Sequence, residues 1–136
     1  AIPLSDLPAE ISRATICLGG HFGPSEKARR VIPGKVFQCI AMGKAVIVGE
    51  NDANRELLTP DQDALFCKMD DPQALARAIA TLYHDPALRE KLGRGAYQTY
   101  CEKAATPVLQ GQVQQAIREY MLHREGQDTL RPVTSV

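Results

Sequence analysis

The strongest constraint on the fold is an alternation of helix-like and strand-like segments through the first half of this 136-residue chain. Apolar residues recur at helical spacing in the first kind of segment, whereas short unbroken apolar runs form the second. In chain order the segments span residues 6–15 (helix), 15–18 (strand), 36–41 (helix), 45–48 (strand), 53–58 (helix) and 64–67 (strand). Strands that alternate with helices over short loops predict a parallel sheet with right-handed crossovers.

Beyond Met69 the pattern indicates helices alone. Three helix starts place a capping side chain before a proline, at Asp71-Pro72, Asp85-Pro86 and Thr106-Pro107. We therefore predict an α/β fold, a Rossmann-like parallel sheet of about three strands with helices on both faces and a helical C-terminal extension. Three strands are few for such a sheet, so we expect upstream segments to supply further strands or the exposed edge to pair with another copy.

Two segments differ from the rest of the chain in composition, and we expect neither to form a regular helix or strand. The stretch 21–34 is rich in Gly, Pro and charged residues, which predicts a charged loop. From Arg124 onward the sequence is polar and irregular, which predicts a disordered tail. We accordingly assign residues 1–123 to one partial Rossmann-like domain and residues 124–136 to the tail.

Charge and hydropathy exclude several classes of function. Sixteen Lys and Arg balance sixteen Asp and Glu, so no general attraction to nucleic acid or to an anionic membrane is expected. No apolar run approaches the roughly 18–20 residues that span a bilayer. The N-terminus has no basic stretch, no long apolar segment and no initiator Met, so we expect no signal peptide and infer part of a longer chain.

The four cysteines, at positions 17, 39, 67 and 101, contain no Cys-x-x-Cys motif. This spacing is typical of neither a zinc site nor a dense disulfide framework. Cys17, Cys39 and Cys67 lie in apolar segments, where a free thiol behaves as a small buried hydrophobe. We therefore expect three buried thiols, no bound metal and a reducing, cytoplasmic compartment.

A series of motifs between Lys35 and Gly93 carries a family resemblance. Ala-Met-Gly-Lys precedes an apolar strand, Arg-Glu-Leu-Leu and a second strand follow, and Asp-Pro-x-x-Leu-Ala and Asp-Pro-x-Leu-Arg begin the next two helices. In this order the motifs resemble the C-terminal, donor-binding domain of retaining GT-B fold glycosyltransferases, the glycosyl transferases group 1. The resemblance covers about residues 7–120, and it implies an N-terminal acceptor-binding domain as a partner.

The donor site that this resemblance implies lies at the predicted helix start after Pro33. Gly34, Lys35 and Val36 would offer backbone N–H groups to a diphosphate, Lys35 would add a positive charge, and Gln38 could bond the ribose hydroxyls. The alternative is a plain turn followed by a solvated lysine. Many family members carry two glutamates eight residues apart here, and those places are occupied by Arg30 and Gln38.

Four further residues are candidates for phosphate or sugar contacts, namely His21, Glu26, Lys27 and Arg30, and Glu56 is a further candidate for the nucleotide-sugar site itself. His21 follows the first predicted strand, at the end where ligands gather in such sheets. Glu26, Lys27 and Arg30 lie in the charged stretch, where surface ion pairs explain them as well. Glu56 corresponds to a glutamate that the family often has after this strand, and it either approaches the sugar or supports its helix. We assign no catalytic residue.

We expect a glycosyltransferase that moves a sugar from a nucleoside diphosphate sugar to an acceptor hydroxyl. The expected substrate is the nucleotide sugar, with no further cofactor, no metal and no nucleic acid, and the intact enzyme would be cytoplasmic or peripheral to the membrane. This chain alone would be inactive. One alternative is a degenerate, non-catalytic module used for association. A response-regulator-like domain is weaker, because Asp70-Asp71, the one adjacent aspartate pair, is better explained by capping Pro72.

Overall fold

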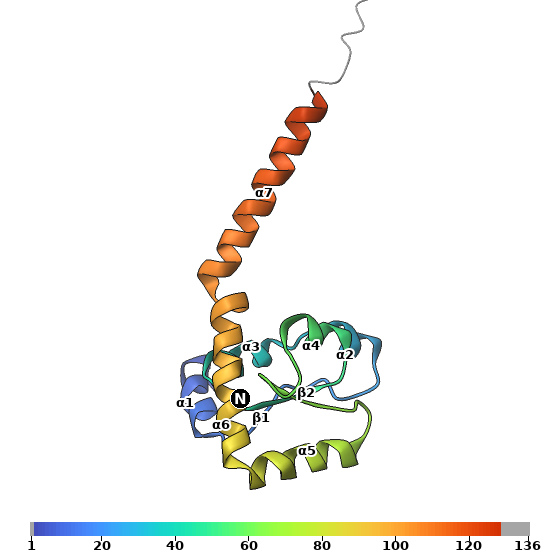
Figure 1. Cartoon of the computed structure of the whole chain (residues 1–136), viewed down its shortest axis with the longest axis vertical. Coiled ribbons are helices and arrows are strands. Elements are labelled where there is room, and N and C mark those ends of the chain that lie inside the picture. The colour runs from blue at the N-terminus through green and yellow to red at the C-terminus, as the bar shows by residue number, and fades with distance from the viewer. Residues whose placement is uncertain (1, 129–136) are drawn as a thin grey trace, which may run out of the picture.

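The computed structural model describes the backbone of residues 2–128 and the side chains of residues 2–124. Its helices and strands follow the predicted order, with one additional helix after the first strand, and then give way to helices alone (Figure 1). The elements are η1 (Leu4–Asp6), α1 (Leu7–Arg13), β1 (Cys17–Leu18), α2 (Glu26–Arg30), α3 (Gly34–Ala41), β2 (Val46–Gly49), α4 (Asp52–Leu57), β3 (Leu65–Cys67), α5 (Pro72–His84), α6 (Pro86–Thr99), η2 (Tyr100–Ala104) and α7 (Thr106–Asp128).

The three strands form one parallel sheet in the order β1-β2-β3, which confirms the predicted α/β fold. Cys17 lies opposite Val46 in the first pairing, and Ile47 lies opposite Leu65 in the second. β1 and β3 are therefore the outer strands of the described sheet. Pairing of an outer strand with a further strand or a second copy stays a prediction.

Helices cover both faces of the sheet because side chains of β2 alternate between two buried clusters. Val46 and Val48 point into a cluster with residues of α3 and α4, whereas Ala45 and Ile47 point into a second cluster with α5 and α6. The strand is buried on both faces, as its adjacent β-branched residues predict. The core therefore lies on either side of this central strand.

Local capping chemistry sets several helix boundaries. The Asp71 carboxylate accepts the Ala74 N–H at 2.9 Å, and the Asp85 carboxylate accepts the Leu88 N–H at 2.8 Å, so two of the three predicted caps are confirmed. The prediction of a cap at Thr106 was wrong, because Thr106 is itself the first residue of α7. The Lys44 amine donates to the Ser12 and Ala14 carbonyls at 2.5 and 3.1 Å. Lys44 thus satisfies carbonyl groups at the end of α1 and ties that helix to the start of β2.

The prediction that residues 21–34 form only a loop was wrong. Residues 26–30 form α2, because the Ser25 hydroxyl accepts the Ala28 N–H at 3.2 Å and Ala28 is buried. The sequence did not predict this short helix because glycine and proline residues flank it. Residues 124–128 continue α7, so the polar tail does not begin at Arg124. The rest of the predicted tail, residues 129–136, lies outside the described part.

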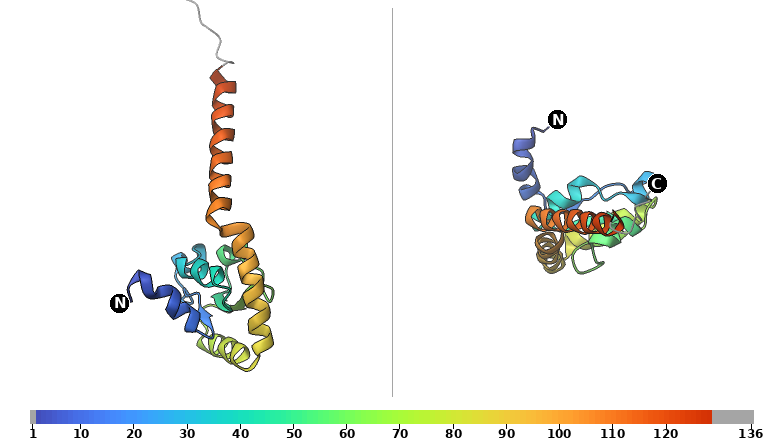
Figure 2. Two further views of the ribbon diagram at one scale, coloured as in Figure 1. Left: turned by 90° about the vertical axis from the view of Figure 1, so that its left-hand side faces the viewer. Right: turned by 90° about the horizontal axis from the view of Figure 1, so that it is seen from above.

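The helix α7 projects from the body of the protein as a long rod (Figures 1 and 2). It follows a π-helical turn, η2, and Ala105 breaks the helix with an extended backbone. Its apolar residues follow helical spacing as predicted, yet the described part of the chain leaves them exposed: Leu109, Val113, Ile117, Tyr120 and Met121. No helix among the described residues is long and apolar enough to cross a membrane.

Candidate functional site

The carboxyl ends of the three strands meet at one rim of the sheet, where parallel folds of this kind bind ligands. The loops after β1 and β3 touch there, since the Asp70 N–H donates to the Phe22 carbonyl at 2.7 Å. Between them, at the end of β2, a Cβ on Gly49 would lie 3.3 Å from the His21 carbonyl and 3.0 Å from Met69. His21 is therefore at this rim, as predicted, with an exposed side chain.

The N-terminus of α3 presents unpaired donors. Pro33 precedes the helix and provides no side-chain cap. The Val36 N–H bonds the Pro33 carbonyl at 2.9 Å, whereas the N–H groups of Gly34 and Lys35 have no partner among the described residues. Such free N–H groups, together with the helix dipole, favour an anion.

The Lys35 side chain extends from this helix start to the loop after β1. A Cβ placed on Gly20 would lie 2.7 Å from the Lys35 ammonium nitrogen and 2.6 Å from its Cε. In the described part of the chain this ammonium has no ion pair and no hydrogen bond. The structure thus brings the unpaired N–H groups and one unpaired positive charge together at this rim of the sheet.

Two other predicted residues of α3 differ in their surroundings. Gln38 is exposed one turn after Gly34, on the outer side of the helix. The Val36 side chain is fully buried in the core and contacts the backbone region of Gly19. Because its N–H is already bonded, Val36 serves packing, and the unpaired N–H groups at the start of this helix are those of Gly34 and Lys35.

A hollow of about 390 Å³ lies between α2 and α4. Three predicted residues, Glu26, Arg30 and Glu56, line it together with Arg29 and Asp52. Within this hollow Arg30 and Glu26 form an exposed ion pair with an N–O distance of 2.8 Å. Lys27 is exposed and does not line the hollow.

A second hollow, of about 390 Å³, is continuous in its lining with the first through Arg29 and Asp52. It is bounded by Glu50 and Lys68, which follow β2 and β3. Among these charges Glu50 is paired with Arg55 at 2.5 Å, whereas Arg29 has no ion pair among the described residues. A charged groove therefore runs along the carboxyl ends of β2 and β3.

Asn51 is a residue of this groove that the sequence reasoning missed. Its side-chain oxygen Oδ1 accepts the Asn54 N–H at 2.7 Å and caps α4, while its side-chain nitrogen Nδ2 donates to the Ala28 carbonyl at 3.1 Å. The side chain thereby fixes α2 against the start of α4. An asparagine directly after a strand and before a helix is a capping signal that could have identified the first of these contacts.

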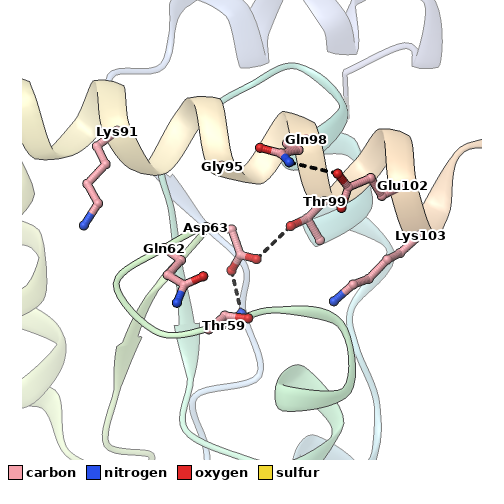
Figure 3. A pocket seen from close by; sticks show the side chains of 9 residues that line it. All are labelled: Thr59, Gln62, Asp63, Lys91, Gly95, Gln98, Thr99, Glu102 and Lys103. Carbon is pink, nitrogen blue, oxygen red and sulfur yellow. Dashed lines mark hydrogen bonds between the residues drawn. The ribbon is translucent and has the colours of Figure 1, made fainter.

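A third hollow, of about 360 Å³, lies between α6 and the turn before β3 (Figure 3). Its central group is the buried Asp63 carboxylate, which accepts the Thr59 N–H at 2.6 Å and the Thr99 hydroxyl at 2.8 Å. Both oxygens are thus bonded within the protein. This arrangement joins the turn to α6 and has a structural role.

The cysteines are free thiols in the described structure, and Cys17, Cys39 and Cys67 are buried as predicted, whereas Cys101 is exposed. The interaction with Cys39 lowers the pKa of Cys17 to about 7, against the opposing effect of burial. The same interaction, together with burial, raises the pKa of Cys39. Among the described residues no three His, Cys, Asp or Glu side chains are grouped to hold a metal ion.

Known proteins resemble this chain in sequence and in fold. A family described as "Glycosyl transferase-like" matches residues 1–108. Among curated proteins, the lipopolysaccharide core biosynthesis glycosyltransferase LpsD of Rhizobium meliloti (strain 1021) is 36% identical over 74 residues. That match covers 52% of this chain and 22% of LpsD, so the chain spans about a fifth of this relative.

Solved structures show the same fold. Sucrose-phosphate synthase from Thermosynechococcus elongatus superposes with a TM-score of 0.69 at 21% identity, covering 84% of this chain and 27% of that one. The C-terminal domain of the glycosyl transferase group 1 family protein LpcC from Francisella tularensis has a TM-score of 0.62 at 18% identity, covering 78% and 51%. At these identities the likeness supports the fold.

Proposed function

The chain belongs to the glycosyl transferase-like family, and on that premise we propose that it is the donor-binding part of a glycosyltransferase. The reaction of the intact enzyme moves a sugar from a nucleoside diphosphate sugar to an acceptor hydroxyl. The acceptor is held by an N-terminal domain of the same enzyme. A separate acceptor domain is consistent with the match to LpsD, which covers only 22% of that protein.

One observation carries the proposal: unpaired N–H groups of Gly34 and Lys35 and the unpaired Lys35 ammonium lie together at the rim of the sheet. A diphosphate is the anion that uses all of them at once, since it offers several acceptor oxygens to backbone donors and to a cation. As the bond to the sugar breaks, negative charge grows on the diphosphate. Donors already in position stabilise that charge in the transition state.

The rest of the donor lies along the groove in this proposal. The glycosyl group occupies the hollow between α2 and α4, where Glu26 and Glu56 offer carboxylates to sugar hydroxyls. Gln38, one turn from the diphosphate, bonds the ribose. The diphosphate is neutralised by protein donors, with no bound metal and no cofactor, and the free thiols favour a reducing, cytoplasmic location.

A second candidate is a degenerate module kept for association. Arg30 and Gln38 occupy the places where many family members carry glutamates, and Arg30 is engaged in an ion pair with Glu26. In that case the fold would persist while the donor chemistry is lost. Binding of a nucleoside diphosphate separates the two candidates.

The test is a titration of the 136-residue chain with ADP, GDP and UDP, followed by backbone amide chemical shifts. We expect at least one of these nucleotides to change the backbone amide chemical shifts of Gly34 and Lys35 more than those of any other residue. Lys35→Met should weaken binding about tenfold, because it removes one charge-assisted contact, whereas Lys91→Met, a matched change on exposed α6, should leave binding unchanged.

A response spread evenly over the surface, or none, would refute the donor site and favour the degenerate module. Sugar transfer by the 136-residue chain alone would contradict the role of the N-terminal domain, because the proposal places the acceptor there.

A further inference from the structure

We infer that Gly20 is a positioning residue for the Lys35 ammonium, so that the absence of a side chain at position 20 sets diphosphate affinity. The inference rests on the proposed function and adds to it a specific determinant of the donor site. Gly20 belongs to the loop after β1 and Lys35 to the start of α3, and the two residues meet at the rim of the sheet.

A side chain at position 20 would displace the end of the Lys35 side chain. A Cβ on Gly20 would lie 2.6 Å from Lys35 Cε and 2.7 Å from Nζ, and Cβ atoms in real proteins essentially never come closer than 3.0 Å. The end of the lysine side chain is flexible, so the ammonium would move before the backbone does. An added methyl group at position 20 therefore displaces the Lys35 ammonium, which carries the positive charge of this side chain.

The loop holds its shape independently of the lysine. Gly20 has φ +86° and His21 has φ +57°, so two successive residues adopt left-handed backbone conformations. Their placement is supported from the sheet, because the Gly19 N–H donates to the Ile47 carbonyl at 2.8 Å and the Phe22 carbonyl accepts the Asp70 N–H. The backbone of Gly20 is thus held in place by the loop, and the end of the Lys35 side chain packs against it.

The experiment measures binding of inorganic pyrophosphate and of UDP, GDP and ADP to the 136-residue chain by isothermal calorimetry, at two salt concentrations. Gly20→Ala and Lys35→Met should each weaken binding about tenfold, the loss expected for one charge-assisted contact. Each should also lower the salt dependence of binding. The double variant should bind no more weakly than either single variant, because both changes remove the same contact.

Gly23→Ala is the matched control, since a Cβ there meets no atom within 4 Å. It should bind like the unchanged chain. Gly20→Asn separates steric displacement from backbone strain, because asparagine adopts left-handed conformations more readily than alanine. It should show the same loss of affinity, and thermal unfolding of every variant verifies that the chain stays folded.

The outcomes distinguish the inference from the proposed function. If the unchanged chain binds none of these anions, the proposed function fails and the inference fails with it. If the unchanged chain binds but Gly20→Ala and Gly20→Asn bind equally well, the inference alone is overturned. Losses that multiply in the double variant would likewise overturn it, as would the lack of a nuclear Overhauser effect between Gly20 Hα and Lys35 Hε protons.

Discussion

Replacing Gly95 by alanine should destabilise the protein, although alanine is the better helix former. Gly95 lies in α6 against the turn that precedes β3, where an added Cβ would lie 2.1 Å from the Gln62 carbonyl oxygen and 3.3 Å from the Asp63 Cα. All of the atoms it meets belong to the backbone. The helix and the turn would therefore have to separate by about 1 Å, because no rotamer change can relieve the contact.

The size of the effect follows from two opposing contributions. Overpacking of this kind costs up to about 3 kcal/mol, and exchanging glycine for alanine within a helix returns about 1 kcal/mol. The net loss is about 2 kcal/mol, which corresponds to a fall in Tm of roughly 4–8 °C for a domain of this size. Separation would also strain the bond between Asp63 and Thr99.

The assay is thermal and urea unfolding followed by far-ultraviolet circular dichroism. Gly111→Ala in α7 is the control, because a Cβ there meets nothing within 4 Å, and this variant should be no less stable than the unchanged chain. A Gly95→Ala protein with an unchanged or higher Tm would refute the reasoning, since it would show that α6 does not lie against the turn as described.

Two further changes test other contacts. Asp63→Ala leaves the buried Thr99 hydroxyl and the Thr59 N–H without an acceptor, so the free energy of unfolding in urea should fall by about 2–3 kcal/mol; a loss below about 0.5 kcal/mol would contradict the bonds. Cys39→Ala should raise the pKa of Cys17 from about 7, because burial then dominates, and thiolate ultraviolet absorbance measures it. In the unchanged chain the Cys17 contribution to stability is fully present above the pKa of the unfolded thiol, about 9, and is lost as pH falls from there through about 7. An unchanged Cys17 pKa in the variant would exclude the Cys39 interaction as its cause.

Most of the helices and strands could be predicted because their signals are local. The aspartate before Pro72 and the aspartate before Pro86 each cap the next helix, because each carboxylate accepts the backbone N–H three residues further on. The unbroken apolar run of β2 likewise predicts from residue type alone that the strand is buried on both faces. The helix α2 escaped prediction because five residues between turn formers give too short a period to recognise.

The candidate site could be predicted in part. Pro33, Gly34 and Lys35 mark a helix start on their own, and the free N–H groups follow from the absence of a cap. The sequence indicated Val36 as one of the groups that bind the donor, whereas the structure buries its side chain in the core. The sequence also could not show that Arg29, Asp52 and Glu56 line one groove. These neighbours come from α2 and α4, which are distant in the sequence and are brought together by the folded sheet and by the Asn51 side chain.

The amino-acid sequence by itself determined the alternation of strands and helices, the two aspartate caps, the buried thiols and the helix start after Pro33 with its unpaired N–H groups. These features depend on contacts within a turn or two of chain, where residue type and spacing decide the outcome. Only the tertiary structure decided that Lys35 lies on Gly20 and that Gly95 admits no side chain. Both are steric contacts between segments distant in sequence, and their distances depend on how the sheet packs its helices.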